Sequence, residues 1–195
     1  MAEINYSDIT FVIPTNRSFI RTESSVPKES NILIQREVTR GEARNAGAKL
    51  AKTEYIAFCD DDIEFSKLFL DYAISLIDDR TIIGLQAYYP SPFLISRFML
   101  FKKSIFDDVG ELFPWQHGEE TEWLIRAWEK GYKLVGVPRE SVYHKEHTIS
   151  MYKNDYLILL RIIRLHPHFL INIIKSVLFK MKYSNYDDKN TLPIK

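Results

Sequence analysis

The chain has 195 residues, with 26 basic and 26 acidic side chains and 46% hydrophobic residues. This composition excludes a largely disordered chain, and its neutral charge excludes global attraction to nucleic acid. The single cysteine, Cys59, excludes an internal disulfide, and no charge-free apolar run reaches the about 18 residues that a membrane-spanning helix needs.

Strands and helices alternate along the sequence from residue 9 to residue 137. Strands are predicted at 9–13, 32–34, 55–59, 82–87, 97–101 and 133–137, and helices at 41–53, 67–77, 103–109 and 119–130. Ser66 is a suitable N-cap for the second helix, and Gly131 is well placed to end the last one. Two prolines make residues 88–96 irregular. The alternation favours an α/β fold with a largely parallel sheet.

The end of the chain differs from the rest in charge. Residues 1–150 carry 18 Lys and Arg against 23 Asp and Glu, whereas residues 151–195 carry 8 against 3. Two apolar helical segments, 156–165 and 169–181, contain half of these basic residues. We expect a catalytic domain at 1–150, a helical tail at 151–183 and a flexible C-terminus at 184–195. The amphipathic tail can lie on an anionic membrane, pack back on the domain or form a homodimer interface.

The most informative stretch is the apolar strand Tyr55–Cys59, which runs directly into Asp60, Asp61 and Asp62. Crowded carboxylates at a strand end repel one another unless a cation lies among them. In an extended segment Asp60 and Asp62 point the same way and can address one site. Oxygen ligands suit Mg²⁺ or Mn²⁺. The cluster therefore indicates a divalent metal site, and an acid-rich surface loop is the alternative.

The motifs around this cluster resemble the family-2-like glycosyltransferases with the GT-A fold. Residues 42–47 (Glu-Ala-Arg-Asn-Ala-Gly) resemble the helix that precedes the Asp-x-Asp strand in that family, and residues 51–62 resemble the strand itself. Residues 11–15, 118–132 and 142–144 resemble further blocks in the family's order. The resemblance implies a GT-A-like α/β/α sandwich with a mostly parallel sheet and a helical C-terminal tail. The short chain is similar to a compact archaeal or viral member of this family.

The resemblance implies a nucleotide-sugar site at the start of the sheet. The residues expected to bind the nucleotide sugar are Pro14, Thr15, Asn16, Gln35, Arg44, Asp60 and Asp61. In the family, acids at the end of the second strand contact the base. Here Gln35 and Arg36 stand in that place, which leaves the nucleotide's identity open.

The resemblance also implies a metal site and a catalytic base. Asp62 would ligate a divalent ion (Mn²⁺ or Mg²⁺), with Asp60 beside it and His144 completing the site. Glu120 matches the base that deprotonates the acceptor, and Glu119 takes that role if the register shifts by one. One metal-binding cluster and one separate carboxylate suffice for single displacement with inversion at the anomeric carbon.

The resemblance implies a hexosyltransferase-type glycosyltransferase acting on a nucleotide-diphosphate sugar and an acceptor glycan, lipid or protein, without nucleic acid. The polar N-terminus carries no signal-peptide pattern, so we expect a cytoplasmic protein, with the tail as its contact to the inner membrane face. One alternative is a nucleotidyltransferase, although residues 15–21 lack the glycine of a phosphate loop. The other is a non-catalytic, membrane-associated nucleotide-sugar binder, which would keep Asp60 and Asp62 but not need Glu120.

Overall fold

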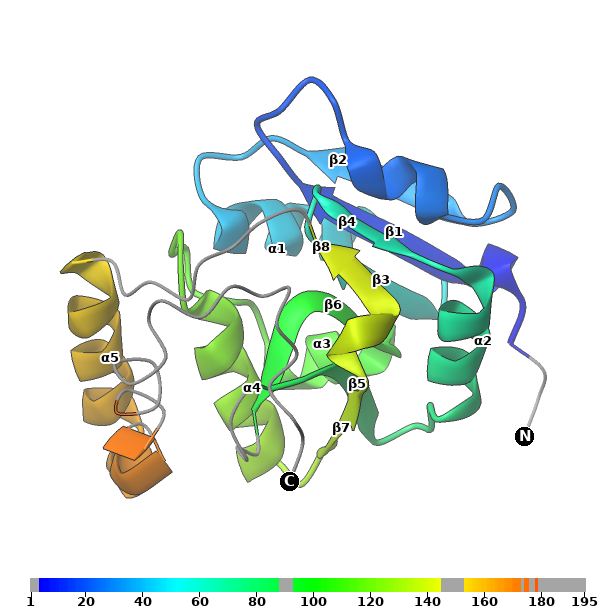
Figure 1. The fold of residues 1–195 in the computed structure, drawn as a ribbon. Helices are drawn as coiled ribbons and strands as arrows, with labels where there is room; N and C mark the ends of the chain where they lie inside the picture. Colours follow the sequence, from blue (N-terminus) through cyan, green and yellow to red (C-terminus); the bar gives the residue numbers. More distant parts are fainter. Residues whose placement is uncertain (1–3, 88–92, 145–152, 173, 176–177, 179–195) are drawn as a thin grey trace.

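The computed structural model describes residues 4–87, 93–144, 153–172, 174–175 and 178. Its centre is a six-stranded sheet in the order β2-β1-β3-β6-β5-β7 (Figure 1). The strands are β1 Ile9–Pro14, β2 Asn31–Gln35, β3 Tyr55–Cys59, β5 Thr81–Gln86, β6 Leu94–Lys102 and β7 Lys133–Val137. β6 runs antiparallel to both its neighbours, and the other pairs are parallel. The expected mostly parallel sheet is confirmed.

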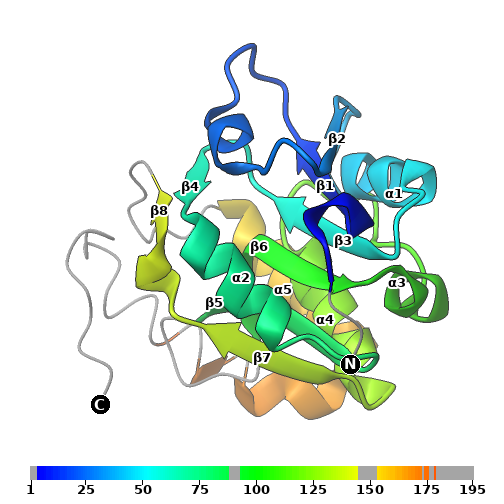
Figure 2. The same cartoon turned by 90° about the vertical axis from the view of Figure 1, so that its right-hand side faces the viewer.

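Helices cover both faces of this sheet (Figure 2). The helix α2 (Lys67–Ser75) packs on one face, where Phe69 and Leu70 join the core formed with Phe11. The other face is covered by α1 (Arg40–Leu50), α3 (Lys103–Val109) and α4 (Glu119–Glu129). Because both faces are covered, β1 is buried along its whole length and reads as a continuous apolar run. This is the α/β/α sandwich that the sequence predicts.

Small residues let α1 approach the sheet closely. A Cβ added at Gly47 would lie 2.2 Å from Cγ1 of Val12 in β1, so a larger residue cannot occupy this position without moving the helix. Thr39 and Glu42 form a capping box that fixes where the helix begins. The end of β1 and the start of α1 are therefore held in a fixed relation.

Two short strands, β4 (Ile63–Phe65) and β8 (Val142–His144), form a separate antiparallel pair. Ile63 faces His144 in this register, which brings a residue from the far end of the domain beside the acid cluster. The 3₁₀ helices are η1 (Tyr6–Asp8), η2 (Arg21–Ser25), η3 (Arg139–Ser141) and η4 (Pro167–Phe169). The strand β4 was not predicted from the sequence.

The second half of the sheet also corrects one prediction. β6 begins at Leu94, three residues before the predicted strand at 97–101, so an irregular segment through residue 96 is wrong. Residues 94 and 95 pair with the end of β5 beyond a register shift between Gly84 and Leu85. A bulge that restores pairing leaves no local sequence signal. The two prolines lie outside the described residues.

The tail packs back on the domain through its first helix, α5 (Lys153–Leu165). Ile162 and Phe169 are buried against Ile125 of α4. His166 adds a polar contact between the tail and α4, since its Nδ1 lies 2.8 Å from Oε1 of Glu129. Of the three alternatives for the tail, packing on the domain is observed for this part. None of the described helices is both long and apolar enough to cross a bilayer.

Candidate active site

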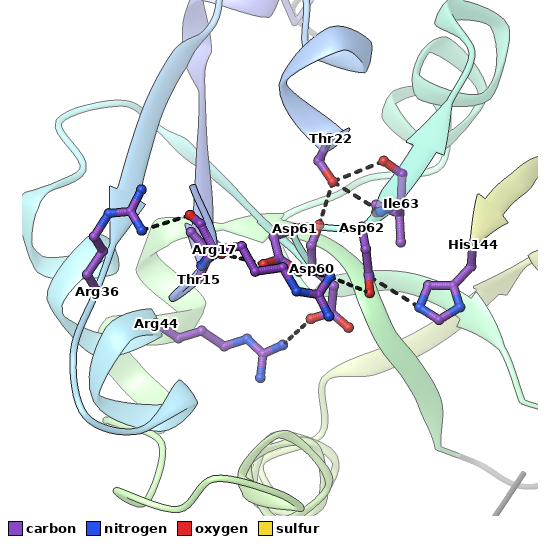
Figure 3. A network of polar contacts seen from close by, with 10 residues as sticks. All are labelled: Thr15, Arg17, Thr22, Arg36, Arg44, Asp60, Asp61, Asp62, Ile63 and His144. Carbon is purple, nitrogen blue, oxygen red and sulfur yellow. Dashed lines mark hydrogen bonds and ion pairs between the residues drawn. The ribbon is translucent and has the colours of Figure 1, made fainter. Parts of the chain in front are cut away.

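The loop after β3 carries the three aspartates at the edge of the sheet and is fixed by η2 (Figure 3). Thr22 is fully buried; its hydroxyl donates to the carbonyl of Asp60 at 2.6 Å and accepts from the amide of Ile63 at 3.2 Å. The amide of Arg21 donates to the carbonyl of Asp61 at 2.9 Å. These bonds fix the backbone of the loop, and the three carboxylates point in different directions (Figure 3).

Two of the aspartates belong to a group, with an exposed arginine, that we call the outer cluster: Arg17, Asp61, Asp62 and His144. Nη1 of Arg17 lies 3.1 Å from Oδ2 of Asp62 and 3.3 Å from Oδ1 of Asp61, and Nε2 of His144 lies 3.2 Å from Oδ1 of Asp62 (Figure 3). Burial raises the pKa of Asp62, but hydrogen bonds and charges of His144 and Arg17 outweigh it and lower that pKa. Asp62 is therefore ionised at neutral pH.

The predicted metal ligands are only partly brought together. Among the described residues, no three or more His, Cys, Asp or Glu side chains are arranged to hold a metal ion. Asp62 and His144 do adjoin, whereas Asp60 is turned toward Arg44, whose Nη2 lies 3.1 Å from its Oδ1. A carboxylate and an imidazole suit Mn²⁺ or Mg²⁺, since such ions take much of their shell from water and phosphate. The pair Asp62 and His144 therefore fits a divalent ion, and Asp60 is not part of the assembled set.

Arg44 is the centre of a buried group that we call the inner cluster: Arg44, Asp60, Glu119 and Glu120. The Arg44 side chain is 1% exposed, and its guanidinium contacts Asp60 on one side and Glu119 on the other. Its Nη1 also lies 3.7 Å from Oε2 of Glu120. The helix α1 supplies the arginine and α4 supplies both glutamates, so Arg44 joins these two helices to the end of β3. Arg44, which was expected to bind the nucleotide sugar, is not among the residues that line the pocket described below.

The two glutamates have different environments. Glu119 is fully buried, and burial together with the charge of Glu120 raises its pKa to about 9 despite the opposing charge of Arg44. Burial also raises the pKa of Glu120, but Arg44, Glu119 and a hydrogen bond from Ser96 outweigh it and bring that pKa to about 2. One guanidinium cannot neutralise three carboxylates, so a proton stays on Glu119. Glu120 is the ionised member of the pair.

Glu120 also has the orientation that a base requires. Its Oε1 accepts a 2.7 Å hydrogen bond from Oγ of Ser96 in β6, and its side chain is 19% exposed. Its Oε2 is itself buried and has no hydrogen-bond partner among the described residues. An ionised carboxylate on a partly accessible side chain can accept a proton from a hydroxyl. Glu119 has no such access, because its side chain is 0% exposed.

A pocket of about 170 Å³ lies at the end of β1 and the start of α1. Pro14, Thr15 and Asn16, which were expected to bind the nucleotide sugar, line it together with Asp61, and the Thr15 hydroxyl donates to the Asp61 carboxylate. Gln35 is not among the lining residues; its carbonyl accepts from the amide of Thr15 at 2.9 Å. The lining residues that sequence reasoning missed are Arg17, Glu37, Val38, Thr39, Arg40, Ala43 and Gln116.

Comparisons with known proteins agree with the fold described above. The family model described as Glycosyl transferase family 2 matches residues 28–104, which include the strand and loop of the three aspartates. No curated protein matches the sequence. Three solved structures with similar folds are instructive, and all have low sequence identity, so they show the fold alone.

The first is the mannosyltransferase PcManGT from Pyrobaculum calidifontis in complex with GDP-Man and Mn²⁺, with 12% identity and a TM-score of 0.56. The match covers 67% of this chain and 55% of PcManGT, so the chain spans about half of that protein. The second is a mutant of Drosophila β-1,4-galactosyltransferase 7 with manganese, UDP-Gal and xylobiose, with 14% identity, a TM-score of 0.54, and coverage of 77% and 79%.

The third is Staphylococcus aureus TarS in complex with UDP, with 14% identity and a TM-score of 0.59 over 80% of this chain and 64% of that chain. By this fold, together with the family match over residues 28–104, the chain is similar to the family-2 glycosyltransferases with the GT-A fold.

Proposed function

We propose that the protein transfers a hexosyl group from a nucleotide-diphosphate sugar to an acceptor hydroxyl by single displacement, with inversion at the anomeric carbon. The observation that carries this proposal is the position of Glu120. It is ionised, oriented by Ser96 and held by the same buried arginine that contacts Asp60 at the end of β3. A base and the donor end of the site are thereby kept in one rigid frame, which is what positioned proton transfer needs.

The donor end of the site is the pocket and the outer cluster. Pro14, Thr15 and Asn16 form the pocket wall at the end of β1, and Val38 offers an exposed apolar surface against which a base or ribose can rest. The structural relatives hold GDP-Man, UDP-Gal or UDP-GlcNAc, which supports a nucleotide sugar as donor. The side chain of Arg17 is 60% exposed, so it can move from the aspartates to a phosphate at low cost.

Asp62 and His144 are the residues that would hold a divalent ion in this proposal. When bound there, such an ion supplies charge neutralisation for the departing diphosphate. The Mn²⁺ in PcManGT and the manganese in the galactosyltransferase support this assignment. Asp60 serves the site differently, because its contact with Arg44 ties the donor end to the inner cluster.

Glu120 acts at the acceptor end. It takes the proton from the acceptor hydroxyl as that oxygen attacks the anomeric carbon, and the Ser96 hydrogen bond keeps its other oxygen in place. Glu119 stays protonated and supports its neighbour, so the choice between the two glutamates falls on Glu120. Inversion follows because a single attack occurs from the face opposite the leaving group.

The test compares Glu120→Gln with the wild type. With a competent nucleotide sugar, we expect kcat for transfer or hydrolysis to fall by about 10²- to 10⁴-fold, while nucleotide affinity stays the same. Glu111→Gln is the matched control, since Glu111 is 54% exposed and pairs only with Lys49 among the ion pairs described. Proton NMR of the first product reports the anomeric configuration. Equal activity of Glu120→Gln and wild type, or a retained configuration, would overturn the proposal.

A further inference from the structure

The outer surface of the tail carries an unusual concentration of exposed apolar side chains. Fifteen large hydrophobic residues are exposed in the part of the chain that the structure describes, and seven of them fall between residues 157 and 178. These seven are Leu157, Leu160, Leu165, Leu170, Ile171, Ile174 and Leu178. Scattered exposed leucines are ordinary, but a cluster on one short segment marks an interaction surface.

The helix α5 has two different apolar sides. Ile158 and Ile162, four residues apart, face the domain and pack with Ile125 of α4. Leu157 and Leu160 are 58% and 62% exposed. At 100° per residue, these two leucines and Arg164 form a stripe on the side of the helix opposite the docked isoleucines. Docking on α4 therefore uses one side of the helix and leaves a second apolar side outward.

Basic residues accompany this outward side. Arg161, Arg164 and Lys175 are exposed on the same segment. Over residues 151–195 the sequence holds 8 Lys and Arg against 3 Asp and Glu, whereas the preceding 150 residues hold 18 against 23. A protein partner of ordinary composition does not require such a concentration of basic residues. An anionic lipid surface favours it, because leucines enter the acyl region while arginines and lysines reach the negatively charged head groups.

We propose that the outward face of residues 157–178 docks on an anionic lipid bilayer. We call this face the lipid-facing surface; it consists of the seven exposed apolar residues together with Arg164 and Lys175. The proposal does not depend on the sugar-transfer reaction, because it follows from exposure and charge of the tail alone.

The same segment lies next to the active site. Arg161 stacks over the ring of Trp115, with 5.7 Å from its Cζ to the ring centre. Trp115 adjoins Gln116, which lines the pocket, and its carbonyl accepts a 3.1 Å hydrogen bond from the amide of Gly41 in α1. The residues Arg161 and Trp115 therefore lie between the tail and the pocket, so a bilayer bound by the lipid-facing surface would lie near the pocket.

The experiment is flotation of the full chain with two kinds of vesicle: phosphatidylcholine alone, and phosphatidylcholine containing phosphatidylglycerol. We expect wild type to float with the anionic vesicles, to remain largely unbound with neutral ones, and to dissociate as salt is raised. Leu157→Gln/Leu160→Gln should lower the partition coefficient by roughly tenfold or more for the pair. Arg164→Gln/Lys175→Gln should lower it by a similar factor on anionic vesicles only.

Leu68→Gln is the matched control, because Leu68 is an 80% exposed leucine on α2, outside the tail. It should float like wild type. Thermal unfolding of each variant shows whether the fold is intact. We expect it to be intact, because the replaced side chains are exposed. Absence of wild-type binding, equal binding to both kinds of vesicle, or a wild-type dimer in solution that Leu157→Gln/Leu160→Gln converts to monomer would overturn the proposal. The last result would assign the surface to a second copy of the chain.

Discussion

The outer and inner clusters each contain an arginine that pairs with carboxylates, but the two arginines differ in their exposure to solvent. The Arg17 side chain is 60% exposed, whereas that of Arg44 is 1% exposed. Exposed ion pairs contribute little and exchange readily, but a buried pair that loses one partner leaves an uncompensated charge. The comparison teaches that the donor end can rearrange around a ligand while the acceptor end stays fixed.

Replacing the two arginines gives the largest expected contrast. Arg44→Met should lower the free energy of unfolding by about 3–5 kcal/mol, because Asp60 and Glu120 lose their buried counter-charge. Arg17→Gln should cost about 1 kcal/mol or less. Urea unfolding followed by circular dichroism measures both. Equal losses for the two variants would show that burial does not separate the clusters.

The pH dependence of stability sharpens the comparison. In the folded chain Glu119 has a pKa of about 9, so it binds a proton that the unfolded chain releases above pH ~4.3. The free energy of unfolding should therefore fall as pH rises between these values, by about 1.4 kcal/mol per pH unit from this group. The depressed pKa of Glu120 acts in the opposite sense, and its contribution is lost as pH falls toward 2.

Glu119→Gln should remove this fall, since the neutral amide does not titrate. Denaturant midpoints between pH 6 and pH 8 provide the comparison, with Glu111→Gln as the surface control that keeps the wild-type slope. An unchanged slope in Glu119→Gln would mean that the proton does not reside on that residue.

A change in the outer cluster should affect metal binding more than stability. Asp62→Asn is expected to weaken Mn²⁺ binding in the presence of nucleotide by roughly tenfold or more, and to lower the unfolding midpoint less than Arg44→Met does. Isothermal titration calorimetry measures the affinity. Asp79→Asn is the control, because Asp79 is 83% exposed, pairs with Lys102 and belongs neither to the two clusters nor to the pocket lining. Unaltered Mn²⁺ affinity in Asp62→Asn would remove this residue from the metal site.

The smallest expected effect concerns how the tail supports the inner cluster. Gly118 precedes α4 with φ of +78°, and an added Cβ would lie 2.4 Å from Cγ2 of Ile158 in α5. Gly131 has a similar φ of +81°, but its Cβ would meet only the flexible end of Arg80 at 3.3 Å. Gly118→Ala should therefore lower the free energy of unfolding by about 1 kcal/mol more than Gly131→Ala. Matched losses would mean that α5 does not brace the start of α4.

Local sequence patterns predict most of the sheet and helices, because apolar runs, Ser66 and Gly131 act within a few residues of where they stand. They do not predict β4, whose three residues become a strand only by pairing with β8 nearly 80 positions away. Long-range pairing of this kind overrides local propensity. The antiparallel β6 was missed at its start for the same reason.

The site shows the same division. Asp62, His144 and Glu120 were predicted from motifs, and the structure places them around one edge of the sheet. The family resemblance implied that Arg44 binds the nucleotide sugar. Its burial was not predicted, because a charged residue on a helix of small residues gives no sign of burial. Its partner Glu119 lies 75 residues away. The missed pocket residues Glu37 and Val38 stand in a loop between β2 and α1, and only the fold turns that loop toward the end of β1.

Nucleotide-dependent stabilisation tests the central claim most directly. The wild type is heated with UDP, GDP or dTDP, each with and without Mn²⁺. The account predicts that one nucleotide raises the melting temperature when Mn²⁺ is present. At a hundredfold excess of nucleotide over its Kd, the free energy of unfolding should rise by about 2.7 kcal/mol. The rise should be lost in Asp62→Asn and kept in Glu120→Gln. No rise with any nucleotide, with or without Mn²⁺, would contradict it.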